Sequence, residues 1–127
     1  AYKDLKLFRP EVIIVKLGTN DSRPDEWVNE DFFYADYLRL VRRMKSISDQ
    51  VYLCYPILPY GFKWQQRDDI LRNKVMKLIK RVSEEEQLPV INLYREEMRD
   101  SVNYYPDGIH PTSNGYDIIA KIIYDNL

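Results

Sequence analysis

The stretch that decides the fold is VIIVKLGTND, residues 12–21. Its first six residues, Val12 to Leu17, are nearly all apolar and mostly β-branched, which is typical of a strand buried on both faces of a parallel sheet. Gly18 follows at a point where the backbone must turn tightly. The stretch therefore predicts a buried strand that ends in a turn carrying polar side chains.

Two further runs of this kind lie at residues 51–57 and 88–93. Between the runs, apolar residues recur with helical spacing in residues 33–44 and 71–82. Residues 2–8 suggest that the chain starts in a helix that stops before Pro10. A last apolar stripe follows Thr112 and Ser113, either of which is placed to cap a helix; the stripe consists of Tyr116, Ile119, Ala120 and Ile123.

Helices alternating with strands predict an α/β fold, a three-layer α/β/α arrangement whose parallel sheet has about three strands. We treat residues 1–127 as part of a single domain and expect residues 59–66 to form a loop with exposed aromatics. Three strands make a thin sheet for a doubly wound domain. A bare edge strand can recruit another chain, so we expect a homo-oligomer that seals the exposed strand Val12 to Leu17.

Composition excludes several classes of protein. Nineteen basic and twenty acidic residues are interspersed, which argues against a nucleic-acid partner, and no apolar stretch is long enough for a membrane span. A single cysteine, Cys54, and a single histidine, His110, cannot form a zinc site of the usual spacing. The sequence does not fix the compartment, and a secreted or periplasmic parent protein is compatible with it.

The polar residues after the first strand form one candidate site. The carboxyl ends of strands in an open α/β sheet are where ligands bind. The Asn20 side-chain amide would be a neutral donor there, suited to an oxyanion that develops in a transition state. The alternative is that Asn20 and Asp21 only close a turn or cap a helix.

A second candidate site lies in YPDGIHP, residues 105–111. Asp107 and His110 are three residues apart, and Gly108 between them lets the loop turn. The carboxylate can then accept a hydrogen bond from one imidazole nitrogen and leave the other free as a general base. The alternative is an ordinary solvated or structural histidine.

Together these two blocks resemble those of the SGNH (GDSL-like) hydrolase family, in its carbohydrate-esterase branch. The sequence KLGTND, residues 16–21, is similar to the family's third conserved block, and the sequence DGIHP, residues 107–111, is similar to its fifth. The resemblance implies an ester hydrolase that works through a serine acyl-enzyme, often on acylated carbohydrates, without a metal or organic cofactor. It also implies that Asn20 lies in the oxyanion hole, His110 is the general base and Asp107 orients it.

The chain departs from the family pattern in having neither the Gly-Asp-Ser block nor the block with the oxyanion-hole glycine. Of its six serines only Ser22 lies near the predicted site, and it is not on a strand-to-helix elbow. We therefore expect the C-terminal part of a domain, inactive alone because the nucleophile is missing. The alternative is a non-catalytic carbohydrate-binding or interaction module on the same scaffold. A nucleotide-binding domain is disfavoured because the glycine-rich motifs are absent.

Substrate contacts are predicted from position and residue type. Gly18 and Thr19 lie at the end of the first strand. Tyr55, Trp64 and Tyr105 are aromatic residues near strand ends that could stack on sugar rings. For each aromatic the alternative is a half-buried packing residue.

Overall fold

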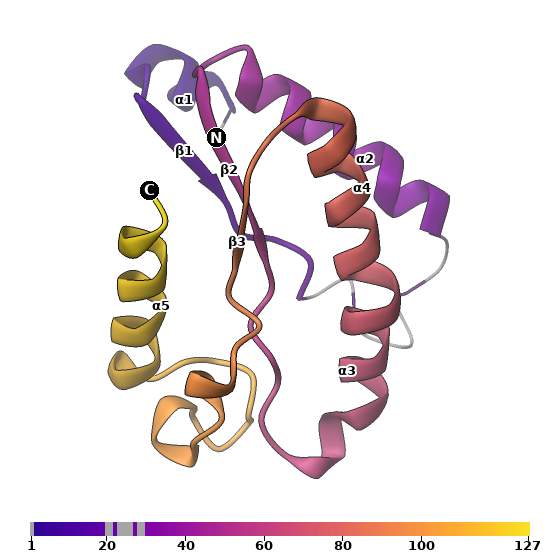
Figure 1. The fold of residues 1–127 in the computed structure, drawn as a ribbon, viewed down its shortest axis with the longest axis vertical. Helices are drawn as coiled ribbons and strands as arrows, with labels where there is room; N and C mark the ends of the chain where they lie inside the picture. Colours follow the sequence, from indigo (N-terminus) through magenta and orange to yellow (C-terminus); the bar gives the residue numbers. More distant parts are fainter. Residues whose placement is uncertain (1, 20–21, 23–26, 28–29) are drawn as a thin grey trace.

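A computed structural model describes residues 2–19, 22, 27 and 30–127 and contains a three-stranded parallel sheet in the order β1-β2-β3 (Figure 1). The strands are β1 (Val12–Val15), β2 (Gln50–Tyr55) and β3 (Val90–Asn92). The register pairs Ile13 with Val51 and Leu53 with Val90. The predicted parallel α/β fold is confirmed, but the strands are shorter than the apolar runs. The last two residues of the first two runs, and Leu88, Pro89 and Leu93 of the third, lie outside the strands.

One face of the sheet is covered by a single layer of helices that lie side by side. α2 (Glu30–Lys45) lies beside a helical run that comprises α3 (Gln65–Ile70), η3 (Leu71–Val75) and α4 (Met76–Glu86). The core on this side joins the apolar faces of sheet and helices: Ile13, Val15, Val51 and Leu53 from the strands, and Tyr37, Val41, Met44, Leu71, Val75, Ile79 and Val82 from the helices. These helices are amphipathic as their sequence spacing predicts.

The opposite face is covered by α5 (Ser113–Asp125), which buries Ile119 and Ile122 in a cluster with Cys54 of β2 and Ile91 of β3. The sheet is therefore the middle of three layers (Figure 1). β1 lies at the sheet edge, and Val12 and Ile14 on this face each keep 37% exposure. The expectation that this strand is buried on both faces is wrong for β1, because α5 packs on β2 and β3.

Two further predictions, one for residues 59–66 and one for the last helix, also need correction. Residues 59–66 are not all loop, since they contain a 3-10 turn at Phe62–Trp64 and α3 begins at Gln65. The last helix is capped by Thr112 as predicted, but Tyr116 and Ala120 are exposed. The buried side of α5 includes Gly115, where a Cβ atom would lie 2.3 Å from the Asn103 carbonyl oxygen. That close approach rotates the helix away from the expected stripe.

The helical run from Gln65 to Glu86 includes one π-helical turn, η3. Its buried positions are spaced four residues apart, at Arg67, Leu71, Val75 and Ile79. In a regular α-helix each such step drifts by about 40° around the axis. The wider π turn counteracts that drift, so buried residues on both sides of it lie along one face of the helical run. α1 (Tyr2–Phe8) lies at the other end of the core, where Tyr2 and Leu5 pack against it.

None of the helices in the described part of the chain is both long enough and apolar enough to cross a membrane.

Candidate functional site

The turn that carries Asp107 and His110 is held by its own aspartate. The Oδ1 atom of Asp107 accepts the backbone N–H groups of Ile109 at 2.8 Å and His110 at 2.9 Å. Its Oδ2 atom lies 2.5 Å from Nδ1 of the His110 ring. The His110 side chain is 74% exposed. One carboxylate therefore fixes both the backbone and the ring of the histidine, and the second ring nitrogen lies on an accessible side chain.

These hydrogen bonds also determine the charge of the aspartate. The backbone N–H of His110, the backbone N–H of Ile109 and the His110 side chain, in that order of importance, hold the pKa of Asp107 well below its usual range. Each donor favours the ionised carboxylate. At neutral pH the group is therefore an acceptor only, which selects the imidazole tautomer with hydrogen on Nδ1.

The loop after β2 supports this turn. The Tyr60 backbone N–H donates to the Gly108 carbonyl at 2.8 Å, and the Trp64 indole Nε1–H donates to the Asp107 carbonyl at 2.6 Å. Gly108 has a φ of +73°, and a Cβ atom there would lie 2.0 Å from the Tyr60 carbonyl oxygen. Only glycine fits between this turn and the loop. The prediction that Gly108 lets the loop turn is thus confirmed. The close Tyr60 carbonyl is a second, steric reason why this position requires glycine.

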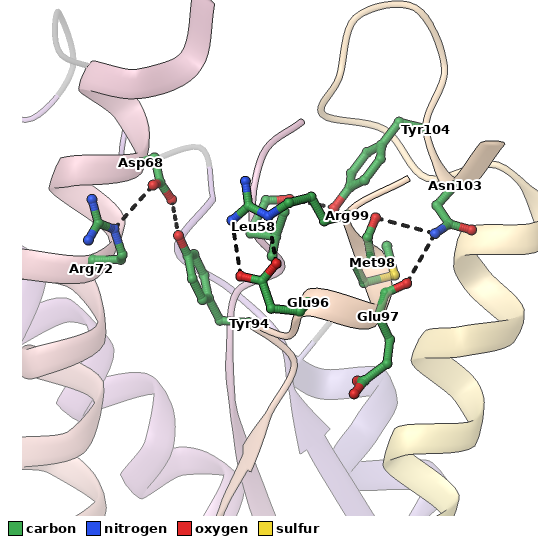
Figure 2. Close-up of polar contacts among 10 residues, drawn as sticks. All are labelled: Leu58, Asp68, Arg72, Tyr94, Glu96, Glu97, Met98, Arg99, Asn103 and Tyr104. Atoms are coloured by element: carbon green, nitrogen blue, oxygen red, sulfur yellow. Dashed lines mark hydrogen bonds and ion pairs between the residues drawn. The ribbon is translucent and has the colours of Figure 1, made fainter. Parts of the chain in front are cut away.

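Tyr104 anchors the start of the same segment. Its hydroxyl donates to the Leu58 carbonyl at 2.5 Å (Figure 2). Its ring stacks on Tyr60 with centroids 5.7 Å apart. Tyr104 also forms an isolated antiparallel bridge with Pro111. The loop containing Asp107 therefore closes on itself at its base and is tied to the end of β2.

Polar contacts connect the preceding segment to α3 and to neighbouring turns. Tyr94 and Asp68 point toward each other, and the tyrosine hydroxyl donates to the carboxylate, which also binds Arg72 (Figure 2). Further along, the Asn103 side-chain amide donates to the carbonyl groups of Glu97 and Met98. The 94–104 segment that leads from β3 to the turn is thus fixed along its length by side chains.

The loop after β1 is the second half of the predicted site. Gly18 has a φ of +116°, and a Cβ atom there would lie 2.8 Å from Cγ1 of Val75, so the tight turn predicted at this glycine is observed. The Thr19 carbonyl accepts a hydrogen bond from Arg67 Nη2 at 2.7 Å. Asn20 and Asp21 lie outside the described residues, so the oxyanion role of Asn20 stays a prediction.

Ser22 and Arg67 form a buried polar pair. Ser22 is fully buried, its hydroxyl donates to the Thr19 carbonyl at 2.5 Å, and Arg67 Nε donates to that hydroxyl at 2.9 Å. Arg67 is only 7% exposed. Sequence reasoning missed Arg67, although it lies four residues before Leu71 and so extends the buried stripe with a charged residue.

The three aromatic candidates are in different surroundings. Tyr55 is half-buried and packs against the core on the α2 and α4 side, as its packing alternative states. Tyr105 is exposed. Trp64 is half-buried and lines a groove of about 610 Å³ together with Tyr60, Phe62, Asp68 and Arg99, among others. Among these candidates, Trp64 combines a bond to the Asp107 turn with a place in the wall of a groove.

Among the described residues, no group of three or more histidine, cysteine, aspartate or glutamate side chains is placed to hold a metal ion.

Comparison with curated proteins finds a relative with a stated activity. The chain is 26% identical over 142 residues to an acetylxylan esterase from Xylanibacter ruminicola, in a match that covers 97% of this chain and 30% of that protein. The chain therefore spans less than a third of the length of this curated relative.

Solved structures share the fold. A lipase/acylhydrolase from Enterococcus faecalis superposes with a TM-score of 0.78 at 20% identity, covering 94% of this chain and 62% of that one. An acetylxylan esterase from Geobacillus stearothermophilus gives a TM-score of 0.74 at 17% identity, covering 97% and 65%. The family model described as GDSL-like lipase/acylhydrolase matches residues 1–118. The chain thus belongs to the GDSL-like lipase/acylhydrolase family.

Proposed function

We propose that this chain carries the base-bearing part of an ester hydrolase that removes acyl groups from carbohydrate through a serine acyl-enzyme. The observation that carries the proposal is the Asp107–His110 pair, with Nδ1 of the ring 2.5 Å from a carboxylate oxygen and the side chain 74% exposed. This arrangement orients an imidazole whose other nitrogen can accept a proton.

In the proposed reaction, Nε2 of His110 takes the proton of a serine hydroxyl as the serine oxygen attacks the ester carbonyl carbon. The carbonyl π electrons move onto oxygen, where the Asn20 amide would donate a hydrogen bond to the developing charge. Collapse expels the alcohol, which takes the proton from His110. Water activated by His110 then hydrolyses the acyl-serine and restores the enzyme.

We further propose that the nucleophilic serine is not among the 127 residues printed. Ser22 is the serine closest in sequence to the Asn20 block, yet it is fully buried and its hydroxyl is engaged by both Thr19 and Arg67. A nucleophile needs an accessible oxygen next to the base. Residues 1–127 alone are therefore expected to be inactive toward esters.

Relatives support both the residue roles and the substrate class. The Geobacillus stearothermophilus acetylxylan esterase has been solved as catalytic mutants at a serine, an aspartate and a histidine, with the histidine three residues after the aspartate. Asp107 and His110 have the same spacing. The curated relative is also an acetylxylan esterase, which favours an acetylated polysaccharide as substrate.

The test compares hydrolysis of p-nitrophenyl acetate and acetylated xylan by two chains. One is residues 1–127, and the other is extended at its N-terminus by a Gly-Asp-Ser-containing segment. We expect activity only in the extended form and a loss of about 10³-fold or more in its His110→Ala variant. Ser101→Ala, at an exposed position, is the control. If the extended His110→Ala variant is as active as the extended wild type, the proposal is contradicted. If residues 1–127 alone are active, and that activity survives Ser22→Ala but is lost in His110→Ala, the missing-serine part of the proposal is contradicted.

A further inference from the structure

Trp64 and Arg67 lie within one helical turn of each other, and each holds a different loop of the proposed site. Trp64 ends a 3-10 turn and donates its indole N–H to the Asp107 carbonyl at 2.6 Å. Arg67 belongs to α3 and donates to the Thr19 carbonyl at 2.7 Å and the Ser22 hydroxyl at 2.9 Å. A segment of four residues therefore touches both loops.

The bond from Trp64 fixes the turn that carries the base. The Asp107 carbonyl belongs to the residue whose side chain orients His110. Trp64 Nε1 also lies 2.9 Å from the position that a Cβ atom on Gly108 would occupy. The indole therefore limits where this turn can lie relative to α3.

The bonds from Arg67 fix Thr19 and Ser22, two described residues that follow β1. The guanidinium reaches both of them through different nitrogens. Arg67 is only 7% exposed. Breaking its hydrogen bonds would leave a buried charge with fewer partners, which would cost free energy. The planar fork of arginine holds two acceptors in one geometry, which a lysine ammonium does less well.

The two side chains also contact each other. The Arg67 guanidinium carbon lies 5.4 Å from the centroid of the Trp64 ring, within the range of a cation–π contact. Further along the same helical run, Val75 abuts Gly18. Trp64 and the helical run that follows it thus contact the β1 loop at two places and the Asp107 turn at one.

We propose that Trp64 and Arg67 act as one brace that sets the position of the Asp107 turn relative to Thr19 and Ser22. They are positioning residues, because they act through the loops that they hold. The catalytic importance of the brace rests on the proposed function, whereas its existence as a mechanical link does not. If the link is real, loosening either side chain disturbs both loops.

The test measures backbone amide hydrogen exchange by NMR in residues 1–127. Trp64→Phe removes the indole donor but keeps a ring beside Arg67, and its distant reporter is the Ser22 N–H, which donates to Thr19. Arg67→Gln removes the cation, and its distant reporter is the Gly108 N–H, which donates to Tyr105. We expect each distant amide to exchange about tenfold faster, as the loss of one net hydrogen bond implies.

Three controls make the result specific. The Leu53 N–H, which donates to Pro89 in the sheet, reports global unfolding and should change less than twofold. Lys77→Gln removes an exposed cation from the same helical run and should leave both loops unchanged. Arg67→Lys should give an intermediate effect. If Arg67→Gln does not fold, Trp64→Phe and Arg67→Lys decide.

The proposal is overturned if each variant affects only the loop that it touches, or if the Leu53 amide accelerates as much as the loop amides. No ester is used, so the outcome is separate from that of the esterase assay. In an active extended form, the same variants should lower kcat by about tenfold with KM within twofold, because misplacing the base affects the reacting geometry.

Discussion

The turn at the carboxyl end of the sheet and the outer strand of the same sheet are built in opposite ways. In the turn, the carboxylate of Asp107, the carbonyl of Gly108 and the hydroxyl of Tyr104 all have partners within the chain. On β1, Val12 and Ile14 remain 37% exposed over a groove of about 630 Å³. The comparison teaches that this chain determines the geometry of its base internally but leaves apolar surface at its sheet edge.

The largest effect is expected at Gly108. Gly108→Ala should lower the free energy of unfolding by about 4 kcal/mol, because a Cβ atom would meet the Tyr60 carbonyl at 2.0 Å in addition to the strain of a positive φ. Gly61→Ala is the matched control, since Gly61 also has a positive φ but nothing within 4 Å, and should cost about 1 to 2 kcal/mol. Equal losses in urea unfolding would show that the turn is not closely packed.

The second prediction compares the two faces of β1. Ile13 is buried under the helices and its neighbour Ile14 is partly exposed on the other face. Ile13→Ala should lower the free energy of unfolding by about 3 kcal/mol, and Ile14→Ala by about 1 kcal/mol or less. The loss is smaller for Ile14 because its side chain buries less surface and its removal leaves no closed cavity. Urea unfolding at low protein concentration measures both. A larger loss for Ile14 would mean that this face is covered.

The same strand tests the proposed assembly. We propose that a second copy seals the β1 edge, so light scattering should show a dimer or larger species. Ile14→Lys should shift that species toward monomer, while Phe32→Lys, an exposed apolar position on α2, should not. A wild-type chain that is monomeric at high concentration would disprove the homo-oligomer.

A smaller effect is expected at Tyr104. Tyr104→Phe removes the hydroxyl that donates to the Leu58 carbonyl and keeps the ring that stacks on Tyr60. The loss should be about 1 kcal/mol, the net contribution of one buried hydrogen bond. Thermal unfolding measures it, and an unchanged midpoint would mean that water replaces the bond.

The smallest effect is a pH dependence from Asp107. The pKa of Asp107 in the folded chain lies below its unfolded value of about 3.9. The ionised carboxylate therefore stabilises the fold at pH values above the unfolded pKa, and this stabilisation is lost as the pH falls below the unfolded pKa toward the folded one. The difference in unfolding free energy between wild type and Asp107→Asn should therefore be present at pH 7 and reduced at pH 3. An identical difference at both values would contradict this linkage.

Local signals in the sequence predicted much of the fold and part of the site. β-branched runs predicted three parallel strands, and the pairing of Asp107 with His110 followed from spacing and a glycine. Thr112 was predicted as one of two caps and is the residue that caps α5. In each case the residues that decide the structure are close together in the chain.

The missed features depend on contacts between distant segments. Arg67 reaches Thr19 across 48 positions, so nothing near either residue indicates the bond. The orientation of α5 depends on Gly115 meeting the Asn103 carbonyl, and the exposed face of β1 depends on where α5 packs. Helical periodicity predicts that a face is buried but not which neighbour buries it.

The π-helical turn at Leu71–Val75 lets one helical run serve two neighbours at once. Such a turn corresponds to one residue more than a regular α-helix needs. If the same residues were wound as a regular α-helix, Arg67 would lie about 80° around the axis from Val75. Arg67 would then point away from Thr19, so the extra residue held in this turn is what allows a side chain of α3 to reach the loop after β1 while α4 packs on the sheet.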